Sequence, residues 1–424
     1  MTSEEFRKAI NQGLGRAVLH IRSHSWEPYA EAIENVCLHN TAYDPQCEGS
    51  RADYVYEIVR LTGEPERFAK IVAEGLLNAR EYSEVEHLFD MAALFAKEGY
   101  GGAREAMLKK FGWDEERKDF LGGEQIVNVD GEKGLLLVAE QIGMWMEGHP
   151  EYWVDDSLLK GEAEGWRERV LAEGAMASVN VRRYREAMEK YKTEAGRRRR
   201  LPEYRNWSYA ELRERIVAGT EDVPRGWLYR WGEHASEEAV REAAADLLKE
   251  EDEKRLVAYL RIFDRRRYPL DHERLIQLAK GVNEEAAIAS CRALRHVKDE
   301  SVRALAIDMM DAGRGVGDAV EMLVLNYVGG DEQRIEKLLA AQCNDEDFHW
   351  CGHAALHLFE ANVEAEAVGT MMLIYERGRC SNCRTGAVRV LMGRGVIPEW
   401  MVEECLFDSS EEVREAAREY RARS

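Results

Sequence analysis

Apolar residues recur at intervals of three and four along most of this chain, with polar and charged residues between them. This spacing puts the apolar side chains on one face of a helix, and it is typical of amphipathic α-helices. Runs rich in valine or isoleucine, which would favour strands, are few. The pattern therefore predicts an all-α protein. In the N-terminal half we expect helices at 2–20, 26–39, 50–62, 65–79, 83–98, 102–111, 132–147, 156–176 and 178–194.

The C-terminal half contains four similar segments, SEEAVREAAADLL, DESVRALAIDMM, SNCRTGAVRVLM and SSEEVREAAREY, which begin at Ser236, Asp299, Ser381 and Ser409. Each begins with a residue suited to N-capping, followed by an arginine and small apolar residues. Candidate helix starts near 283, 316, 345, 380 and 409 are about 30 to 35 residues apart, the length of one helix-turn-helix repeat. Small residues such as alanine let stacked helices approach closely, so the sequence predicts a repeat array.

Residues from about 236 to 424 resemble HEAT repeats, which are close to the armadillo class. The stretch Asp299, Val302, Arg303 and Ala306 carries this resemblance best. It implies an α-solenoid that is regular in the C-terminal half, with degenerate repeats in the N-terminal half. A weaker resemblance, in size class and helical content, is to the bacterial HEAT-like DNA glycosylases.

The composition mainly indicates the cellular compartment of the protein. Eight cysteines in 424 residues are too sparse for a disulfide framework and fit a reducing compartment. The N-terminus lacks the apolar run of a signal peptide, and no stretch is long enough to cross a membrane. We therefore expect a cytoplasmic monomer that has no membrane partner and no cofactor.

Charge is distributed unevenly along the chain, although the net charge is −21. Residues 1–176 hold 19 Lys and Arg against 34 Asp and Glu, whereas residues 178–232 hold 14 against 8. These differences predict three segments: an acidic helical region at 1–176, a basic and aromatic segment at 177–235, and the repeats at 236–424. We expect an exposed loop at the four arginines Arg197 to Arg200.

The basic segment could bind phosphates, because clustered cations contact a nucleic-acid backbone and aromatic rings stack on bases. Trp227 and Trp231 are four residues apart and share a helix face, where they form either a pocket wall or part of the core. A solvated helix that pairs with acidic parts of the same chain is the other interpretation. The candidate nucleic-acid-binding residues are Arg182, Arg183, Arg185, Arg197, Arg198, Arg199, Arg200, Arg205, Trp227, Arg230 and Trp231.

A second candidate site is the loop 40–51, which places Tyr43, Gln46, Glu48 and Arg51 in one turn between helices. A carboxylate could serve as base and Arg51 could bind an anion. The alternative is a capped turn in which Arg51 forms a surface ion pair. The segment 122–134, rich in glycine, is expected to be a turn before an apolar helix.

The cysteines and histidines at Cys351, His353, Cys380 and Cys383 suggest a zinc site. In a solenoid, however, His349 and Cys383 would occupy equivalent places in adjacent repeats, about 10 Å apart. We therefore expect no bound metal.

Two functions are compatible with these features. The first is a scaffold or regulator that binds a protein or peptide partner on a concave surface, the negative charge favouring a basic partner. The second is an enzyme, a DNA glycosylase that excises modified or damaged bases in duplex DNA, in repair or in antiviral defence against foreign DNA. The resemblance to glycosylases implies a catalytic carboxylate, for which Asp44, Asp130 and Asp222 are candidates.

Overall fold

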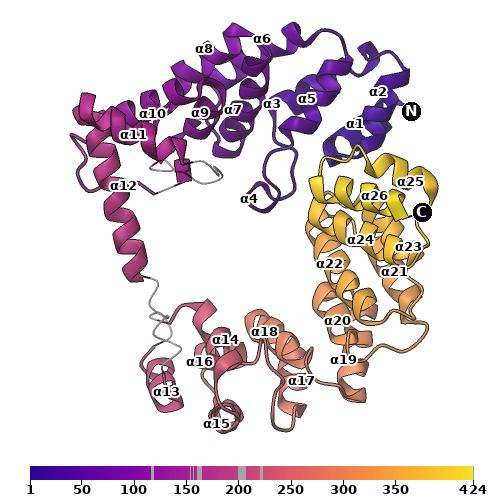
Figure 1. Ribbon diagram of the computed structural model, residues 1–424. Helices are drawn as coiled ribbons and strands as arrows, with labels where there is room; N and C mark the ends of the chain where they lie inside the picture. The colour runs from indigo at the N-terminus through magenta and orange to yellow at the C-terminus, as the bar shows by residue number, and fades with distance from the viewer. Residues whose placement is uncertain are drawn as a thin grey trace. The chain divides into compact units, whose positions relative to one another are not determined.

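The computed structural model describes residues 1–115, 119–152, 154–155, 157–159, 165–198, 207–219 and 223–423, and for residues 194–198 it describes the backbone alone (Figure 1). The elements in these ranges are 26 α-helices, two 3-10 helices and one small antiparallel sheet. The expected all-α helical-repeat fold is confirmed. None of the described helices has the length and apolar character needed to cross a membrane.

The chain divides into two compact units. Unit 1 comprises residues 1–199, 379–382 and 398–424, and unit 2 comprises residues 200–378 and 383–397. This division differs from the three segments expected from charge, because the end of the chain belongs to the same unit as its beginning.

Unit 1 is built from antiparallel helices, and a helix often packs beside the one two places further along the chain. For example, α3 packs on α5, and α5 packs on α7. Its helices are α1 (Ser3–Gln12), α2 (Gly15–Ser23), η1 (Glu27–Tyr29), α3 (Ala30–Leu38), α4 (Pro45–Glu48), α5 (Ala52–Leu61), α6 (Pro65–Asn78), α7 (Tyr82–Lys97), α8 (Gly101–Lys110), α9 (Gly123–Asp130), α10 (Glu132–Trp145), η2 (Ser157–Leu159), α11 (Trp166–Ala177), α12 (Val179–Arg198), α25 (Glu399–Cys405) and α26 (Glu411–Arg423).

Four features of this half differ from what the sequence predicted. The helix expected at 2–20 is two helices, because Gly13 adopts a left-handed conformation with φ of 76° and ends α1. The turn expected at 122–134 contains helix α9. A hairpin of β1 (Gly112–Asp114) and β2 (Asp119–Leu121) was not expected. In addition, α12 extends to Arg198, so Arg197 and Arg198 are part of a helix rather than a loop.

The two ends of the chain meet inside unit 1. Gly15 lies so close to α25 that a Cβ atom there would be 1.9 Å from the carbonyl oxygen of Glu404. The Arg16 side chain pairs with the Glu404 carboxylate, which is 5% exposed, and the Ser409 amide donates to the Gly13 carbonyl over 2.8 Å. Helix α25 therefore packs against α2, and the turn after α25 is bonded to the turn between α1 and α2 (Figure 1).

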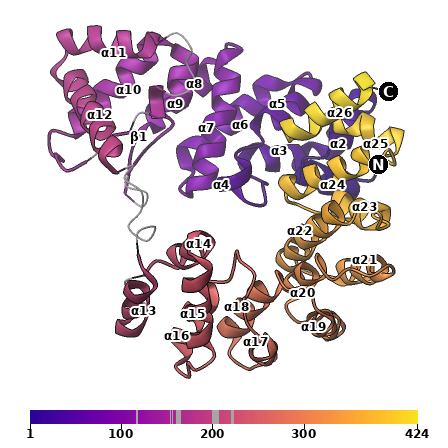
Figure 2. The ribbon, with the colours of Figure 1, turned by 60° about the horizontal axis from the view of Figure 1, so that its bottom comes forward.

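Unit 2 is a succession of helix pairs that follow one another from α13 to α24 (Figures 1 and 2). The helices are α13 (Tyr209–Ala218), α14 (Arg225–His234), α15 (Glu237–Leu247), α16 (Glu253–Arg261), α17 (Glu273–Ala279), α18 (Glu284–Leu294), α19 (Glu300–Asp311), α20 (Val316–Leu323), α21 (Asp331–Ala341), α22 (Asp345–Ala361), α23 (Val368–Arg377) and α24 (Ser381–Gly393).

The helix starts predicted for this half agree with the structure. The side chains of Ser236, Asn283 and Asp299 each accept a hydrogen bond from a backbone amide in the first turn. Ala306 is fully buried, as a contact position between stacked helices should be. Arg303 donates to the Asn326 carbonyl and forms a two-point ion pair with Asp331, which is 3% exposed, so this arginine ties α19 to the start of α21.

Candidate functional site

A hollow of unit 1 lies between β1, β2, α7, α9 and α10, with a volume of about 830 Å³. Its floor is apolar, because Phe111, Val138 and Ile142 are at most 6% exposed, and Tyr184 of α12 is fully buried beside them. Pockets of this size with an apolar floor and a few polar groups are the usual places where proteins bind ligands.

The hairpin and α9 owe their position to a glycine. Gly122 follows β2 with φ of 88°, a left-handed conformation that side chains rarely adopt. A Cβ atom at this position would lie 2.2 Å from the ring of Phe89 on α7. Any larger residue would therefore push β2 and the start of α9 away from α7.

Aromatic side chains form one wall of the pocket. Trp113 of β1 stacks on Trp145 at the end of α10 with ring centroids 4.0 Å apart, and His149 stacks on Trp145 at 3.8 Å. Phe120 and Tyr152 meet Trp145 edge to face at 5.6 and 5.0 Å. Figure 2 shows β1 beside the end of α10. These contacts hold the rings in fixed orientations, which lowers the entropy lost when a ligand binds.

Carboxylates surround this wall. The described lining residues contain no lysine or arginine, and their six acidic side chains are Glu86, Glu115, Asp119, Glu124, Glu151 and Asp155. Such an arrangement makes the potential in the pocket strongly negative, because concave low-dielectric walls concentrate the field.

Two tyrosines in the pocket stay neutral. Burial raises the pKa of the Tyr152 phenol, and its hydrogen bond of 2.7 Å to Asp119 Oδ1 raises it further. Burial also raises the pKa of Tyr184. Both phenols are therefore protonated at neutral pH, and the negative charge of the pocket comes from its carboxylates.

Behind α9 the pocket is supported by a hydrogen bond between two partly buried side chains. Gln125 Nε2 donates to Asp90 Oδ1 over 2.7 Å, which joins α9 to α7. Burial raises the pKa of Asp90, although the hydrogen bond from Gln125 acts in the opposite direction. This contact fixes the polar face of α9 that faces the pocket.

Unit 2 has a second hollow, of about 690 Å³, between α13 and α15. Its arginine is paired, since Asp246 accepts from Arg213 Nε and from Tyr209 Oη, both over 2.7 Å. The pocket of unit 1 is lined by more acidic and more aromatic residues, so it is the candidate site.

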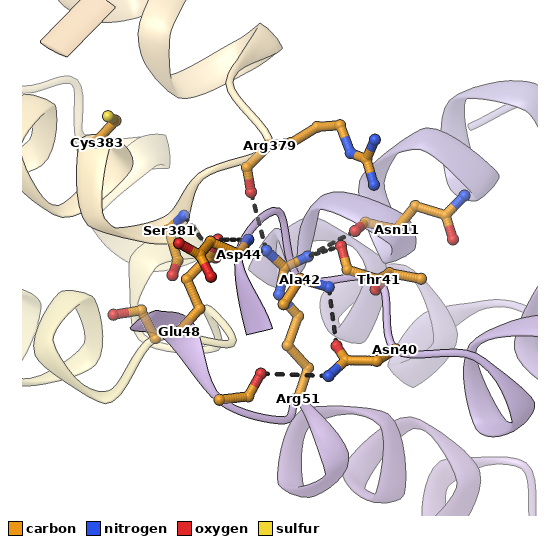
Figure 3. Close-up of polar contacts among 12 residues, drawn as sticks. Asn11, Asn40, Thr41, Ala42, Asp44, Glu48, Arg51, Arg379, Ser381 and Cys383 are labelled. Atoms are coloured by element: carbon orange, nitrogen blue, oxygen red, sulfur yellow. Dashed lines mark hydrogen bonds and ion pairs between the residues drawn. The ribbon is translucent and has the colours of Figure 1, made fainter. Parts of the chain in front are cut away.

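The loop 40–51 is a packed turn rather than an open site (Figure 3). The side chains of Glu48 and Arg51 are 1% and 4% exposed and form an ion pair of 3.0 Å. Arg51 also donates to the carbonyls of Asn11, Thr41 and Arg379, at 2.6, 3.2 and 2.9 Å. The surface ion pair expected for Arg51 was wrong, because the guanidinium is buried among backbone oxygens. Anion binding at this loop stays a prediction.

The other members of this loop bind neighbouring backbone amides or are partly or fully exposed. Asp44 Oδ1 accepts from the Gln46 amide and caps α4. Gln46 is exposed and Tyr43 is half-buried. Glu48 Oε2 accepts from the Ser381 amide over 2.9 Å, so the loop holds residues 379–381 against the N-terminal helices (Figure 3).

The arginines of the basic segment that the structure describes mostly bind this protein's own backbone. Arg182 donates to the Ala175 carbonyl and Arg183 to the Gly143 carbonyl, whereas Arg185 is exposed on α12. The structure does not describe the side chains of Arg197 and Arg198. Outside the described residues altogether lie Arg199, Arg200, Arg205 and the catalytic candidate Asp222. Phosphate binding by this segment stays a prediction.

The tryptophan pair forms a helix contact within unit 2. Trp231 is 4% exposed and its indole donates to the Trp207 carbonyl over 2.9 Å, which supports the core interpretation for this residue. Trp227 is half-buried against the Trp207 ring at 5.4 Å, and Arg230 is exposed beside Tyr229. Asp130, a candidate catalytic residue, is held by Arg104 in a two-point ion pair at 2.7 and 2.8 Å.

The distance expected between His349 and Cys383 was wrong. His349 Nδ1 and Cys383 Sγ are 3.5 Å apart rather than about 10 Å, because side chains from neighbouring helices cross most of the distance between the axes. Cys351 is fully buried, and burial raises the pKa of its thiol to about 12, so it is a core residue. His353 lies near His357, with ring centroids 4.4 Å apart. The residues expected to form one zinc site are therefore divided among separate contacts.

Sequence reasoning missed the aromatic pocket. Its rings come from β1, β2, α10 and the segment after it, and no local motif joins Trp113, Phe120, Trp145 and Tyr152. The only available signal was the density of aromatic and acidic residues between 111 and 155. A comparison with protein-family models and a search of curated proteins found no match for this chain.

Proposed function

We propose that this protein is a helical-repeat binding module that holds a positively charged segment of a protein or peptide partner in the aromatic, acidic pocket of unit 1. The observation that carries the proposal is the lining of that pocket, in which six carboxylates surround a wall of fixed aromatic rings. Aromatic rings attract cations electrostatically, and carboxylates pair with lysine and arginine.

The net charge of the whole chain also favours a positively charged partner. A net charge of −21 attracts a basic partner over long range and speeds its association at low salt. The same charge repels phosphates, so this pocket is a poor place for a nucleic acid. A basic peptide is therefore the partner whose charge fits best.

The test is fluorescence anisotropy of a labelled Arg- and Lys-rich peptide at low and physiological salt. We expect binding that weakens as salt rises, and no binding of a matched peptide with glutamates in place of the cations. Trp145→Ala removes the ring on which Trp113 and His149 stack, so the aromatic wall loses its support. Loss of one cation–aromatic contact of this wall, on the order of 1 kcal/mol, should weaken binding about 5-fold. Asp119→Asn should weaken it about 3-fold, because the asparagine can still accept from Tyr152.

The matched control is Glu66→Gln on α6. It removes the same charge from an exposed position that is 71% accessible and outside the pocket. Equal losses in Glu66→Gln and Asp119→Asn would mean that only net charge matters. Binding that is unchanged in Trp145→Ala and Asp119→Asn would exclude the pocket as the site.

The glycosylase hypothesis has weaker support from the described residues. Asp44 caps a helix and Asp130 is paired with Arg104, so neither carboxylate is placed as the partner of a developing sugar cation. The hypothesis stays open to a direct assay, the formation of abasic sites in duplex DNA that carries modified bases.

A further inference from the structure

A cluster of two histidines and a glutamate lies on one face of unit 2, far along the chain from the residues of the aromatic pocket. His353 and His357 are four residues apart on α22, so both imidazoles project from the same face of that helix. Glu321 extends from the neighbouring helix α20, and its Oε1 is 2.7 Å from His357 Nδ1. One ligand atom from each of the three side chains lies within 4.8 Å of the others.

From this juxtaposition we infer that Glu321, His353 and His357 form a binding site for a divalent transition-metal ion of the zinc class. Two imidazoles and one carboxylate are a ligand set that Zn²⁺ accepts, with a fourth position left for water. Imidazole nitrogens favour such ions over Mg²⁺ and Ca²⁺, which prefer oxygen ligands.

The geometry needs only side-chain rotation to accept the ion. Bonds of about 2.0 Å in a tetrahedron put two ligand atoms about 3.3 Å apart. The Glu321–His357 separation is 2.7 Å, and all three ligand atoms lie within 4.8 Å of one another, so small side-chain rotations reach that value. His357 is 46% exposed at its side chain and Glu321 is 18% exposed, so an ion can reach the site from solvent.

The two helices that carry the ligands are held closely together. Gly317 on α20 lies where a Cβ atom would be 3.1 Å from the Trp350 carbonyl oxygen on α22, which means the backbones nearly touch. A site built on two packed helices keeps its ligands in register, which favours binding of a metal over a looser surface arrangement.

The surrounding charges on balance favour a cation. Asp318 lies one turn before Glu321 on α20, and Glu360 is near His357. Arg292 and Arg295 are opposing charges near Asp318, and the Arg295 guanidinium is bound to the carbonyl and carboxylate of Asp264.

The experiment is a Zn²⁺ titration of the full chain, stripped with a chelator, in competition with a chromogenic zinc indicator. Wild type should bind one ion more than the double variant His353→Ala/His357→Ala. Glu321→Gln should weaken that ion at least about 10-fold, while Glu360→Gln, a matched loss of charge beside the site, should leave it within about 2-fold. Circular dichroism confirms that each variant keeps its helices.

Co²⁺ serves as a second probe, because thiolate ligands give it an intense near-ultraviolet absorption that nitrogen and oxygen ligands do not. The proposed site predicts that the ion lost in the double variant lacks this absorption. The inference is overturned if the double variant binds as many ions as wild type with the same affinity, or if the ion that it loses shows thiolate absorption. This outcome is independent of peptide binding in unit 1.

Discussion

Replacing Arg51 by methionine should strongly destabilise unit 1, although the residue lies in a loop. The side chain is 4% exposed, and it pairs with Glu48, which is 1% exposed. Methionine has a similar length but leaves the Glu48 carboxylate buried without its cation. It also removes three hydrogen bonds, to the carbonyls of Asn11, Thr41 and Arg379.

The expected loss is about 3 to 5 kcal/mol in the free energy of unfolding, the range for removing one partner of a buried pair. Burial raises the pKa of Glu48, but the hydrogen bond from Ser381 and the charge of Arg51 outweigh it, and the net shift is downward. In the variant this pKa should rise. The double variant Arg51→Met/Glu48→Gln should recover part of the loss, because no buried charge is then left unpaired.

Urea unfolding followed by circular dichroism measures the loss, and hydrogen exchange at the Ser381 amide locates it. That amide donates to Glu48, so its protection should fall in Arg51→Met while amides in α19 of unit 2 keep theirs. Arg51→Lys should be intermediate, since one ammonium cannot reach all the carbonyls. A loss below about 1 kcal/mol with normal Ser381 protection would refute the role of this pair.

Three further predictions concern packing and pH. Burial lowers the pKa of His87 to about 4, against 6.5 in the unfolded chain, so the unfolded state binds the extra proton first as the pH drops. The free energy of unfolding should therefore fall by up to about 3 kcal/mol between about pH 6.5 and pH 4. In His87→Gln the urea midpoint should change less over this pH range. Ala306→Asp should cost several kcal/mol because the site is fully buried, and a neutral result would contradict the repeat register. Gly15→Ala should cost roughly 1 to 3 kcal/mol through its clash with the Glu404 carbonyl, whereas Gly102→Ala, with open space around it, should be neutral or stabilising in the same thermal melts.

The helices of the repeats could be predicted from sequence because their signals are local. Capping residues such as Asn283 and Asp299 satisfy amides within the same first turn, and periodic apolar residues mark the buried face. Gly13, however, broke a helix that periodicity alone had joined.

The sites could not be predicted in this way, because each depends on residues that are distant in the chain. The partners of Arg51 include the Asn11 and Arg379 carbonyls, and no sequence pattern shows that a loop arginine will be buried between the two ends of the chain. Glu321 is separated from His357 by 36 residues and by a whole helix.

The sequence by itself determined the all-α class, the repeat period and most helix boundaries, since these follow from interactions within a few residues. The tertiary structure alone decided the candidate sites. It brought aromatic rings and carboxylates from β1, β2 and α10 to one pocket, and it packed α25 against α2. The physical reason is that side-chain burial and the pairing of charges are set by packing between elements, which local spacing does not encode.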